Sequence, residues 1–287
     1  MTNMSLSDIY SHTSASIVAL VVLYKPSKEC YNNILTYIHS IDMLYIIDNS
    51  PKPSILLQKL KTHTNTTILS THQNLGIAKA YNIALAEASS EGYQWLFTMD
   101  QDSFFRDNDI NKFIEYFLKT DTQALAIYTP LHNKKFISQS IDLEPGAVMS
   151  SGNIVSISKA LSIEGFDEKL FIDEVDHDFC MRLKLHNYKI IQNQQIAISH
   201  HLGTMIPNSP HKKYSATRLY YMMRNYLYLY HKHKTNYPSF FKNRSKYLLK
   251  FFIKQIIFQR NKYKRIKMIG LGIKDYYKKR MGYTYEF

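Results

Sequence analysis

Apolar, strand-like runs alternate with helix-like runs through the first 120 residues, and this alternation is the strongest constraint on the fold. The run IVALVVLY (17–24) is continuously apolar and rich in β-branched residues, as a strand buried on both faces would be. Further strand-like runs lie at 43–48, 66–70 and 93–100, and helix-like runs lie at 28–40, 54–61, 76–89 and 107–120. This βαβα order with short connections predicts an α/β fold with a mostly parallel central sheet and helices on both of its faces.

The pattern becomes less regular after the fourth predicted strand. We expect strands at 124–130 and 148–158, the second interrupted by a Ser-Ser-Gly kink. A helical pattern follows at 174–187.

Composition excludes several classes of protein. The 287 residues are 45% hydrophobic and include 23 Tyr and 15 Phe, which argues against disorder. Cys30 and Cys180 have no metal-ligand spacing, which favours a reduced, cytosolic protein. The N-terminus lacks a basic start followed by an apolar stretch, and no run of about 18 apolar residues occurs, so we expect neither a signal peptide nor a membrane span.

The positive charge of the chain is concentrated near its C-terminus. The whole chain has a formal net charge of +13, whereas residues 231–287 hold 16 Lys and Arg against the acids Asp275 and Glu286, a net charge of +14. The preceding 230 residues carry a net charge of −1. We therefore expect a nearly neutral globular domain at 1–230 and a strongly basic, aromatic-rich helical segment at 231–287.

Polar side chains follow three of the predicted strands where each strand ends. They are Tyr24 with Lys25, Asp48 with Asn49, and Asp100 with Asp102. Because ligands of parallel sheets bind beyond the carboxyl ends of the strands, we expect these side chains at one edge. Asp100 and Asp102 point the same way in an extended chain, and a hard divalent cation between them would relieve their repulsion. The alternative is a solvated turn, in which Asp and Ser are common.

Six acidic residues crowd the stretch from Asp167 to Asp178, around the start of the predicted helix at 174–187. Acids at a helix start complement its dipole, and Asp178 can pair with Arg182 one turn later, so a purely structural role is one alternative. The cluster nevertheless exceeds the needs of one helix end. A carboxylate that faces the strand-end cleft from this helix start would be placed to act as a general base.

Eight short motifs follow one another along the chain: VVLYKP, IIDNS, NLGIAKAYNIAL, TMDQDS, SSGNIVSIS, GFDEKLFIDEVDHDFCMRL, ISHHLG and RLYYMMRN. Together, over residues 15–230, they resemble the family 2 glycosyltransferases with the GT-A fold, and above all the rhamnosyltransferase-like branch that builds bacterial surface polysaccharides such as O-antigen. The resemblance implies an inverting, metal-dependent transferase with Mg²⁺ or Mn²⁺ as cofactor. It also implies a nucleoside diphosphate sugar as donor, with dTDP-rhamnose as the first expectation, and a hydroxyl of a lipid-linked oligosaccharide as acceptor.

The resemblance assigns donor-site roles residue by residue. Tyr24 matches the nucleotide-binding end of the first strand, Asp48 matches the acid that recognises the pyrimidine base, and Asn49 follows it. The DxD motif falls on Asp100, near the ribose, and on Asp102, which would bind the cation. Further donor-side residues implied by the motifs are Asn74, Gly76, Lys79 and Gly152.

The same resemblance places the base and the remaining charges. Counting from Leu170 and Phe171 puts the family's catalytic Asp on Asp176, with Asp173 as the alternative base. His200 matches a histidine near the diphosphate and the metal. Arg218 and Arg224 would add positive charge near the diphosphate, or else serve as packing and surface residues.

The basic segment suggests where the protein works. Lys242, Lys246, Lys250 and Lys254 recur every four residues, and we expect Leu248, Leu249, Phe252, Ile253, Ile256 and Ile257 to fill the other side of the same helix. A basic amphipathic helix suits an anionic membrane surface, so we expect a cytoplasmic protein, peripheral on the inner face of the bacterial inner membrane. A solvated basic helix packed on the body is the alternative.

Three other functions are compatible with parts of the sequence. The enzyme could transfer another hexose from a UDP- or dTDP-sugar. A nucleic-acid-binding protein could use the basic, aromatic segment to neutralise phosphates and stack bases, but the nearly neutral body with clustered acids argues against a nucleic-acid partner. An inactive sugar-nucleotide binding module is disfavoured, because Asp102 and Asp176 are both present.

Overall fold

The computed structural model describes residues 16–52, 54–71, 73–132, 144–200 and 214–285. These residues form two compact units. The first, which we call the sheet unit, comprises the described residues up to Asn74, together with Ala80–Gly165 and Arg182–His200. The second, which we call the helical unit, comprises Leu75–Lys79, Phe166–Met181 and the described residues after His200.

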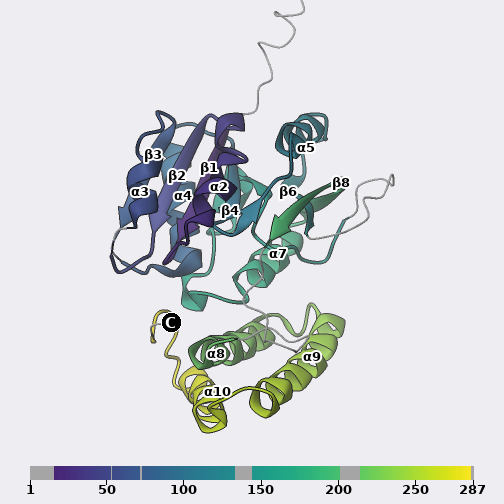
Figure 1. Ribbon diagram of the computed structural model, residues 1–287. Helices are drawn as coiled ribbons and strands as arrows, with labels where there is room; N and C mark the ends of the chain where they lie inside the picture. The colour runs from purple at the N-terminus through teal and green to yellow at the C-terminus, as the bar shows by residue number, and fades with distance from the viewer. Residues whose placement is uncertain (1–15, 53, 72, 133–143, 201–213, 286–287) are drawn as a thin grey trace, which may run out of the picture. The chain divides into compact units, whose positions relative to one another are not determined.

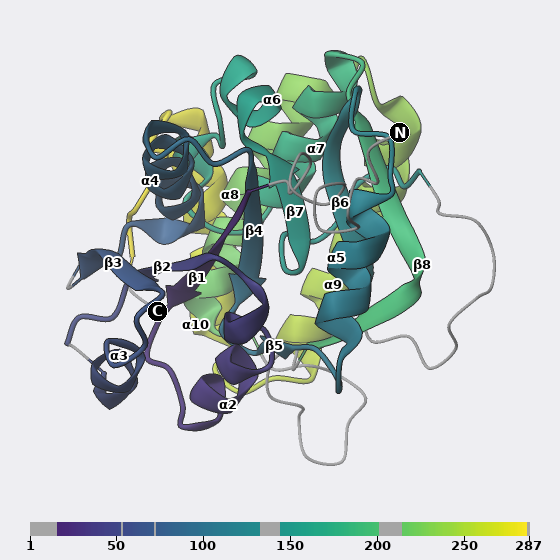
Figure 2. The ribbon, with the colours of Figure 1, turned by 90° about the horizontal axis from the view of Figure 1, so that it is seen from above.

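Eight strands among the described residues of the sheet unit form one sheet in the order β3-β2-β1-β4-β7-β6-β8-β5 (Figure 1; Figure 2 labels all eight). Their bounds are β1 Ile17–Leu23, β2 Met43–Asp48, β3 Thr66–Thr71, β4 Trp95–Asp100, β5 Ser103–Phe104, β6 Leu125–His132, β7 Asn153–Ser156 and β8 Lys189–His200. The block β3-β2-β1-β4 is parallel, as the alternating pattern predicts. β7 runs antiparallel to both of its neighbours, which makes the sheet mixed.

Helices cover both faces of the parallel block. Their bounds are α2 Glu29–Leu35, η1 Ile38–Ser40, α3 Ile55–Leu60, α4 Gly76–Ser90, α5 Asp109–Leu118 and α6 Ile157–Ser162. Figure 2 shows α2 and α3 on one side of β1 and β2, and α4 on the other. All seven residues of β1 are consequently buried, which explains its unbroken apolar sequence.

The predicted strand at 148–158 is shorter in the structure. Gly152 has a φ of +83°, so the chain bends immediately before β7 begins at Asn153. After four residues the chain turns into α6, in which Ile157 and Ala160 are buried one helical turn apart. The β-branched residues of this stretch therefore divide between a strand and a helix, because burial on a helical face outweighs their strand propensity.

In the helical unit, the long helix α8 packs against both α9 and α10. Its elements are η2 Glu168–Leu170, α7 Val175–Leu185, of which the part up to Met181 belongs here, α8 Ala216–His233, α9 Pro238–Ile257 and α10 Lys262–Tyr277. α8 and α9 share an apolar core that includes Leu219, Leu229, Phe241, Leu248 and Phe252. Residue 230, where we place the end of the globular domain, lies within α8.

α10 packs closely against α8. A Cβ atom at Gly272 would lie 2.6 Å from the backbone oxygen of Tyr220, so only glycine permits this approach of the two helices. Met268 and Asp275 lie one turn on either side of Gly272 and are also buried. The glycine therefore marks the side of α10 that contacts α8.

The predicted separation of lysines and apolar residues on α9 is only partly correct. Leu248 and Phe252 are buried, as expected. Leu249, Ile253 and Ile257, however, are 64%, 47% and 55% exposed, and they recur every four residues on the solvent side. Lys242, Lys246, Lys250 and Lys254 are exposed as well, so the lysines flank an apolar row instead of opposing it. No helix in the described ranges has the length and apolar character to cross a membrane.

Candidate functional site

The carboxyl ends of β1, β2 and β4 bring the predicted donor residues to one edge of the sheet unit. Leu23 pairs with Asp48 on β2, and Val22 pairs with Asp100 on β4, so the two acids flank the end of β1. Tyr24 continues directly from β1 at the same edge. The structure therefore places Tyr24, Asp48 and Asp100 together, as the parallel order of these strands predicts.

Asp48 presents a buried carboxylate at this edge. Asp48 is only 1% exposed, and its Oδ1 atom accepts a hydrogen bond of 2.9 Å from the backbone nitrogen of Ser50. Its Oδ2 atom is buried and has no hydrogen-bond partner among the described residues. Because an unpaired buried acceptor costs about 1–3 kcal/mol, this oxygen is suited to a donor group supplied by a ligand.

Gln101, between the two acids of the DxD motif, connects β4 to the end of β1. Its side-chain amide accepts from the backbone nitrogen of Tyr24 at 2.9 Å and donates to the backbone oxygen of the same residue at 3.1 Å. Its own backbone oxygen accepts from Nδ2 of Asn33 at 3.1 Å. Sequence reasoning missed this role, because β4 ends at Asp100 and the chain turns at Gln101 and Asp102, where the expected alternation of an extended chain does not continue.

The DxD acids lie beside a small network of serine hydroxyls. The backbone nitrogen of Asp100 donates to Oγ of Ser151 at 3.0 Å, and that hydroxyl donates to Oγ of Ser103 at 2.8 Å. Ser103 pairs with the backbone of His200 on β8, while the side chain of His200 lies outside the described residues. The expected metal contact of His200 therefore stays a prediction.

Asp100 and Asp102 are both partly exposed and offer oxygen donors only. No group of three or more His, Cys, Asp or Glu side chains in the described ranges is arranged to hold a metal ion. Mg²⁺ usually keeps several waters and binds through one or two carboxylates together with substrate phosphates. The donor set at residues 100 and 102 fits that kind of ion, with the phosphates of a ligand completing the coordination.

Gly152 brings the SSG segment close to β4. Its φ of +83° lies in the left-handed region, and a Cβ atom there would come within 2.8 Å of Pro130 and 2.9 Å of Ile198. Its backbone nitrogen donates to the oxygen of Thr98 at 2.7 Å. Glycine is thus required at this position, and it holds Ser151 beside Asp100.

The other predicted donor residues fall in different places. Asn49 is buried, and its backbone nitrogen donates to the oxygen of Leu23 at 2.7 Å. Asn74 is the last residue of its stretch of the sheet unit, whereas Gly76 and Lys79 belong to the helical unit. Gly76 is buried at the start of α4, and Lys79 is exposed. Their roles toward a donor stay predictions.

One face of α8 binds the acidic segment that precedes and begins α7. Arg218 donates to both carboxylate oxygens of Asp173, at 2.9–3.2 Å. Nδ2 of Asn225 donates to the backbone oxygens of Leu170 and Ile172, each at 2.5 Å, and to that of Asp173 at 3.2 Å. These α8 residues are seven apart and therefore lie on the same side of the helix, which explains part of the RLYYMMRN motif.

The same face continues to the end of α8. Tyr228 and Lys232 both donate to Oδ2 of Asp167, each at 2.7 Å. Lys232 also lies 2.8 Å from Oδ1 of Asp178, a fully buried carboxylate that is bound by Nε2 of His233 at 2.9 Å. Asp178 thus pairs with α8, and Arg182, its predicted partner one turn later, donates to the backbone oxygens of Ile163 and Gly165.

Two of the acids in this segment have shifted pKa values. Burial by itself would raise the pKa of Glu174, but His177 and Arg244 outweigh burial and hold that pKa below its ordinary value. Asp167 behaves in the same way, because Lys232 and Tyr228 outweigh its burial and lower its pKa. Both acids are therefore charged structural partners at neutral pH.

The two candidate bases have different surroundings. Both oxygens of Asp173 accept from the guanidinium of Arg218, so its lone pairs are directed toward a cation. Asp176 is half-buried in the first turn of α7, where its carboxylate complements the helix dipole.

Arg224 is fully buried and belongs to a different set of contacts. Its guanidinium donates to the backbone oxygen of Gly282 at 2.8 Å and to Oγ1 of Thr284 at 3.1 Å, and it lies over the rings of Tyr220 and Tyr221. The expected contribution of Arg218 and Arg224 to the donor diphosphate stays a prediction. Sequence reasoning could not pair Arg224 with residues about 60 positions later, because no local pattern links them.

A mixed sheet whose parallel half ends in Asp48 and the DxD acids is the arrangement of a GT-A glycosyltransferase, and structural neighbours agree. The structure of "S. aureus TarS 1-349 in complex with UDP-GlcNAc" matches with a TM-score of 0.59 and 16% identity, over 90% of this chain and 81% of that one. That of "GalNAc-T7 with UDP, GalNAc and Mn2+" matches with a TM-score of 0.57 and 11% identity over 79% of this chain. This chain covers 50% of the GalNAc-T7 chain.

The chain belongs to glycosyl transferase family 2, whose profile matches residues 25–179. A relative in Shigella flexneri, "dTDP-rhamnosyl transferase RfbF", is 26% identical over 236 residues, which cover 74% of this chain and 79% of that protein. These findings confirm the expected fold and the rhamnosyltransferase-like resemblance. The protein is therefore a glycosyltransferase.

Proposed function

We propose that the protein transfers L-rhamnose from dTDP-rhamnose to a hydroxyl group, with inversion at the anomeric carbon. The observation that carries the proposal is the placement of Asp48, Asp100 and Asp102 at one edge of the sheet in a family 2 glycosyltransferase. The 26% identity to a dTDP-rhamnosyl transferase supports the choice of donor. Another hexose from a UDP-sugar is the second candidate, because the neighbour TarS is seen with UDP-GlcNAc.

Asp48 is suited to recognise the base of the donor. Thymine and uracil each present one ring N–H between two carbonyl groups, and the unpartnered Oδ2 of Asp48 is an acceptor for such a donor. Leaving this buried carboxylate oxygen without a hydrogen bond costs free energy, so the site rejects a base that lacks the ring N–H. Tyr24, at the end of β1, would contact the base or the ribose.

Asp100 and Asp102 would hold Mg²⁺ or Mn²⁺ on the donor diphosphate. The neighbour GalNAc-T7 contains UDP and Mn²⁺, which supports a divalent ion in this fold. Such an ion, when bound, neutralises charge on the leaving diphosphate. Ser151 holds the backbone nitrogen of Asp100, and the side chain of Gln101, between the two acids, holds the backbone of Tyr24, so the DxD segment is positioned before a ligand arrives.

Asp176 would accept the proton of the acceptor hydroxyl. The hydroxyl oxygen attacks the anomeric carbon from the face opposite the diphosphate, the bond to the diphosphate breaks, and the proton passes to the carboxylate. A general base typically contributes about 10²–10⁴-fold to the rate. We assign this role to Asp176 from its register in the motif that starts at Leu170 and Phe171. The alternative, Asp173, accepts from Arg218 through both of its oxygens.

Turnover of a nucleotide-sugar panel tests this proposal. Release of nucleoside diphosphate from dTDP-rhamnose, UDP-glucose, UDP-GlcNAc and GDP-mannose is measured with Mn²⁺, with Mg²⁺ and with EDTA. We expect dTDP-rhamnose to be turned over fastest and EDTA to abolish release. Preference for a UDP-sugar supports the second candidate, and metal-independent release contradicts the assigned role of Asp102.

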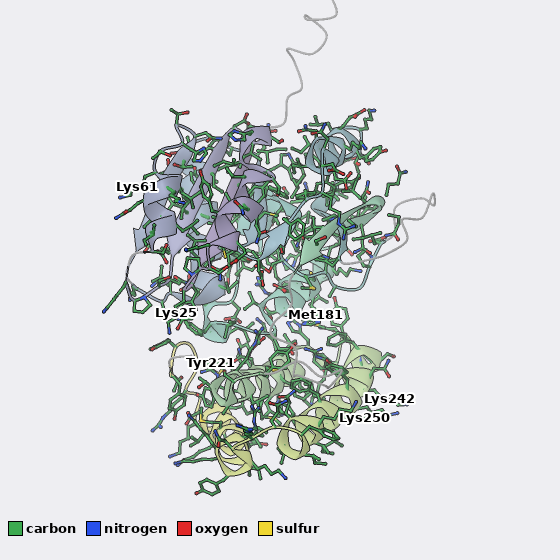
Figure 3. All side chains as sticks on the ribbon, viewed as in Figure 1. Lys25, Lys61, Met181, Tyr221, Lys242 and Lys250 are labelled. Atoms are coloured by element: carbon green, nitrogen blue, oxygen red, sulfur yellow. The ribbon has the colours of Figure 1, made fainter. Side chains whose placement is uncertain are left out.

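We further propose that α9 attaches the enzyme to an anionic bilayer, where a lipid-linked saccharide would be the acceptor. The apolar row Leu249, Ile253 and Ile257 is exposed, and the four lysines at 242, 246, 250 and 254 flank it. Figure 3 labels Lys242 and Lys250 on this helix. An apolar row beside a row of lysines fits lipid tails and acidic headgroups at once, whereas a second copy of the same face would be repelled by its charge.

Charge reversal on α9 tests the bilayer proposal. Each Lys near an anionic bilayer contributes roughly 1 kcal/mol, so replacing all four with Glu should lower affinity for phosphatidylglycerol-containing vesicles by about 10³-fold or more. Vesicle co-sedimentation at rising salt measures this, and wild-type binding should weaken with salt without vanishing because the apolar term is not screened.

A matched variant controls for net charge. Lys28, Lys52, Lys61 and Lys112 are exposed lysines of the sheet unit, and replacing them with Glu changes the charge equally. That variant should still bind vesicles. Two results would contradict the bilayer proposal. The α9 variant could co-sediment with vesicles as wild type does, or wild type could form concentration-dependent dimers that the α9 variant does not form.

A further inference from the structure

The end of the described chain, Arg280–Tyr285, forms a short segment that we call the C-terminal strap. It is held to α8 by two side chains. Nη1 of Arg224 donates to the backbone oxygen of Gly282 and to Oγ1 of Thr284, at 2.8 and 3.1 Å. The hydroxyl of Tyr221 accepts from the backbone nitrogens of Thr284 and Tyr285, each at 2.9 Å. These contacts tie an irregular segment to a helix that lies about 60 residues earlier in the chain.

The strap lies against the loop at 169–174, which leads directly into the first turn of α7. The backbone nitrogen of Gly282 donates to the oxygen of Lys169 at 2.8 Å. The ring of Phe171 has its centroid 5.3 Å from that of Tyr283 and 5.2 Å from that of Tyr221. Phe171 therefore packs against both the strap and the helix that holds the strap.

This loop has an unusual backbone. Phe171, Asp173 and Glu174 have φ values of +60°, +60° and +64°, in a region that non-glycine residues seldom adopt. Three such residues within four positions persist only where surrounding contacts determine their conformation. Asp176, the candidate base, follows two residues after the last of them.

Arg224 connects the strap to the other contacts that hold this loop. While its Nη1 atom binds the strap, its Nε atom donates to Oδ1 of Asn225 at 3.0 Å. That bond leaves the amide nitrogen of Asn225 directed at the backbone oxygens of Leu170, Ile172 and Asp173. One buried guanidinium thus orients the amide that holds the loop and the strap that packs on it.

We propose that the C-terminal strap and Arg224 are positioning elements for catalysis, which hold the 169–174 loop in the conformation that presents Asp176. The proposal rests on the assignment of Asp176 as the base. It separates the basic C-terminal region into two parts with different tasks. Arg280–Tyr285 acts on the loop beside the candidate base, and the exposed face of α9 acts on the bilayer.

The test uses full-length protein with single substitutions. Tyr283→Ala removes the ring that packs on Phe171, and Tyr263→Ala removes an equally large tyrosine that is 80% exposed on α10, as the matched control. Hydrogen exchange of the backbone amides at 169–176 is followed by mass spectrometry. We expect exchange at least about tenfold faster in Tyr283→Ala than in wild type, with Tyr263→Ala like wild type. Equal protection of the loop in all three proteins would overturn the proposal.

Kinetics then distinguish positioning from donor binding. Arg224→Lys keeps the charge but loses the planar fork that bonds Asn225 and the strap at once. We expect a lower kcat, with the KM for the donor and the Kd for dTDP within about twofold of wild type. An unchanged kcat with a raised KM would instead place Arg224 at the diphosphate and overturn its positioning role. Failure of wild type to bind dTDP would count against the proposed function alone, because the exchange measurement needs no ligand.

Discussion

The Asp176→Asn variant is expected to lose between about 10²- and 10⁴-fold in turnover while it binds the donor as wild type does. Asn has nearly the same shape as Asp but cannot accept the proton of the acceptor hydroxyl. The first turn of α7 has a second acid, Asp178, so the helix start keeps a complement to its dipole. Release of dTDP at saturating donor measures turnover, and calorimetry with dTDP measures binding.

Asp173→Asn is the matched comparison for this prediction. Asp173 is bound through both oxygens by Arg218, so its replacement should loosen the loop before α7 more than it affects proton transfer. We expect a smaller loss of turnover than in Asp176→Asn, together with a lower melting temperature. Full activity of Asp176→Asn combined with an inactive, folded Asp173→Asn would exchange the two roles.

Replacing Asp102 with Asn should abolish most metal-dependent binding of the donor. Removal of one carboxylate charge weakens binding of the cation. Without the cation, the negative charge on the leaving diphosphate is not neutralised, which raises the transition-state free energy by several kcal/mol and lowers turnover by roughly 10²–10³-fold. Calorimetry of dTDP binding with and without Mn²⁺ measures the change in affinity. We expect Mn²⁺ to raise the affinity of wild type for dTDP and to leave the affinity of the variant unchanged.

Asp107→Asn controls for the loss of an acid near the same strand end. Asp107 is exposed and has a φ of +45°, a conformation that Asn tolerates well. It should bind dTDP and Mn²⁺ as wild type does. If Asp102→Asn also keeps its Mn²⁺-dependent affinity, the cation does not bind at the DxD acids.

The parallel half of the sheet and its polar edge could be predicted because each signal is local. Apolar runs such as 17–24 reveal strands that are buried on both faces, and the residues that close those runs must lie at the carboxyl edge. β2 occupies the predicted residues 43–48, and Asp48 and Asp100 flank β1 as expected. The same reasoning could not find β7 and α6, since Gly152 and tertiary burial divide one β-branched run between a strand and a helix.

Side-chain partners that are distant in sequence were not predictable. The pairing of Asp173 with Arg218 spans 45 residues, and that of Arg224 with Thr284 spans 60. Periodicity on α9 indicated an amphipathic helix but not which apolar residues would be buried. Leu248 is buried and Leu249 is exposed, because α8 covers only part of the apolar surface. Contacts of this kind depend on how helices pack, which a single sequence does not determine.

The most direct test of the central claim is the rate at which wild type releases dTDP from dTDP-rhamnose in the presence of Mn²⁺, compared with Asp176→Asn and with an EDTA-treated sample. We predict release by wild type that exceeds release from UDP- and GDP-sugars, that falls by at least about 10²-fold in Asp176→Asn, and that stops in EDTA. Two results would contradict the central claim. In the first, folded wild-type protein releases no nucleoside diphosphate from any nucleotide sugar and also fails to bind dTDP. In the second, neither Asp176→Asn nor EDTA changes the rate of release.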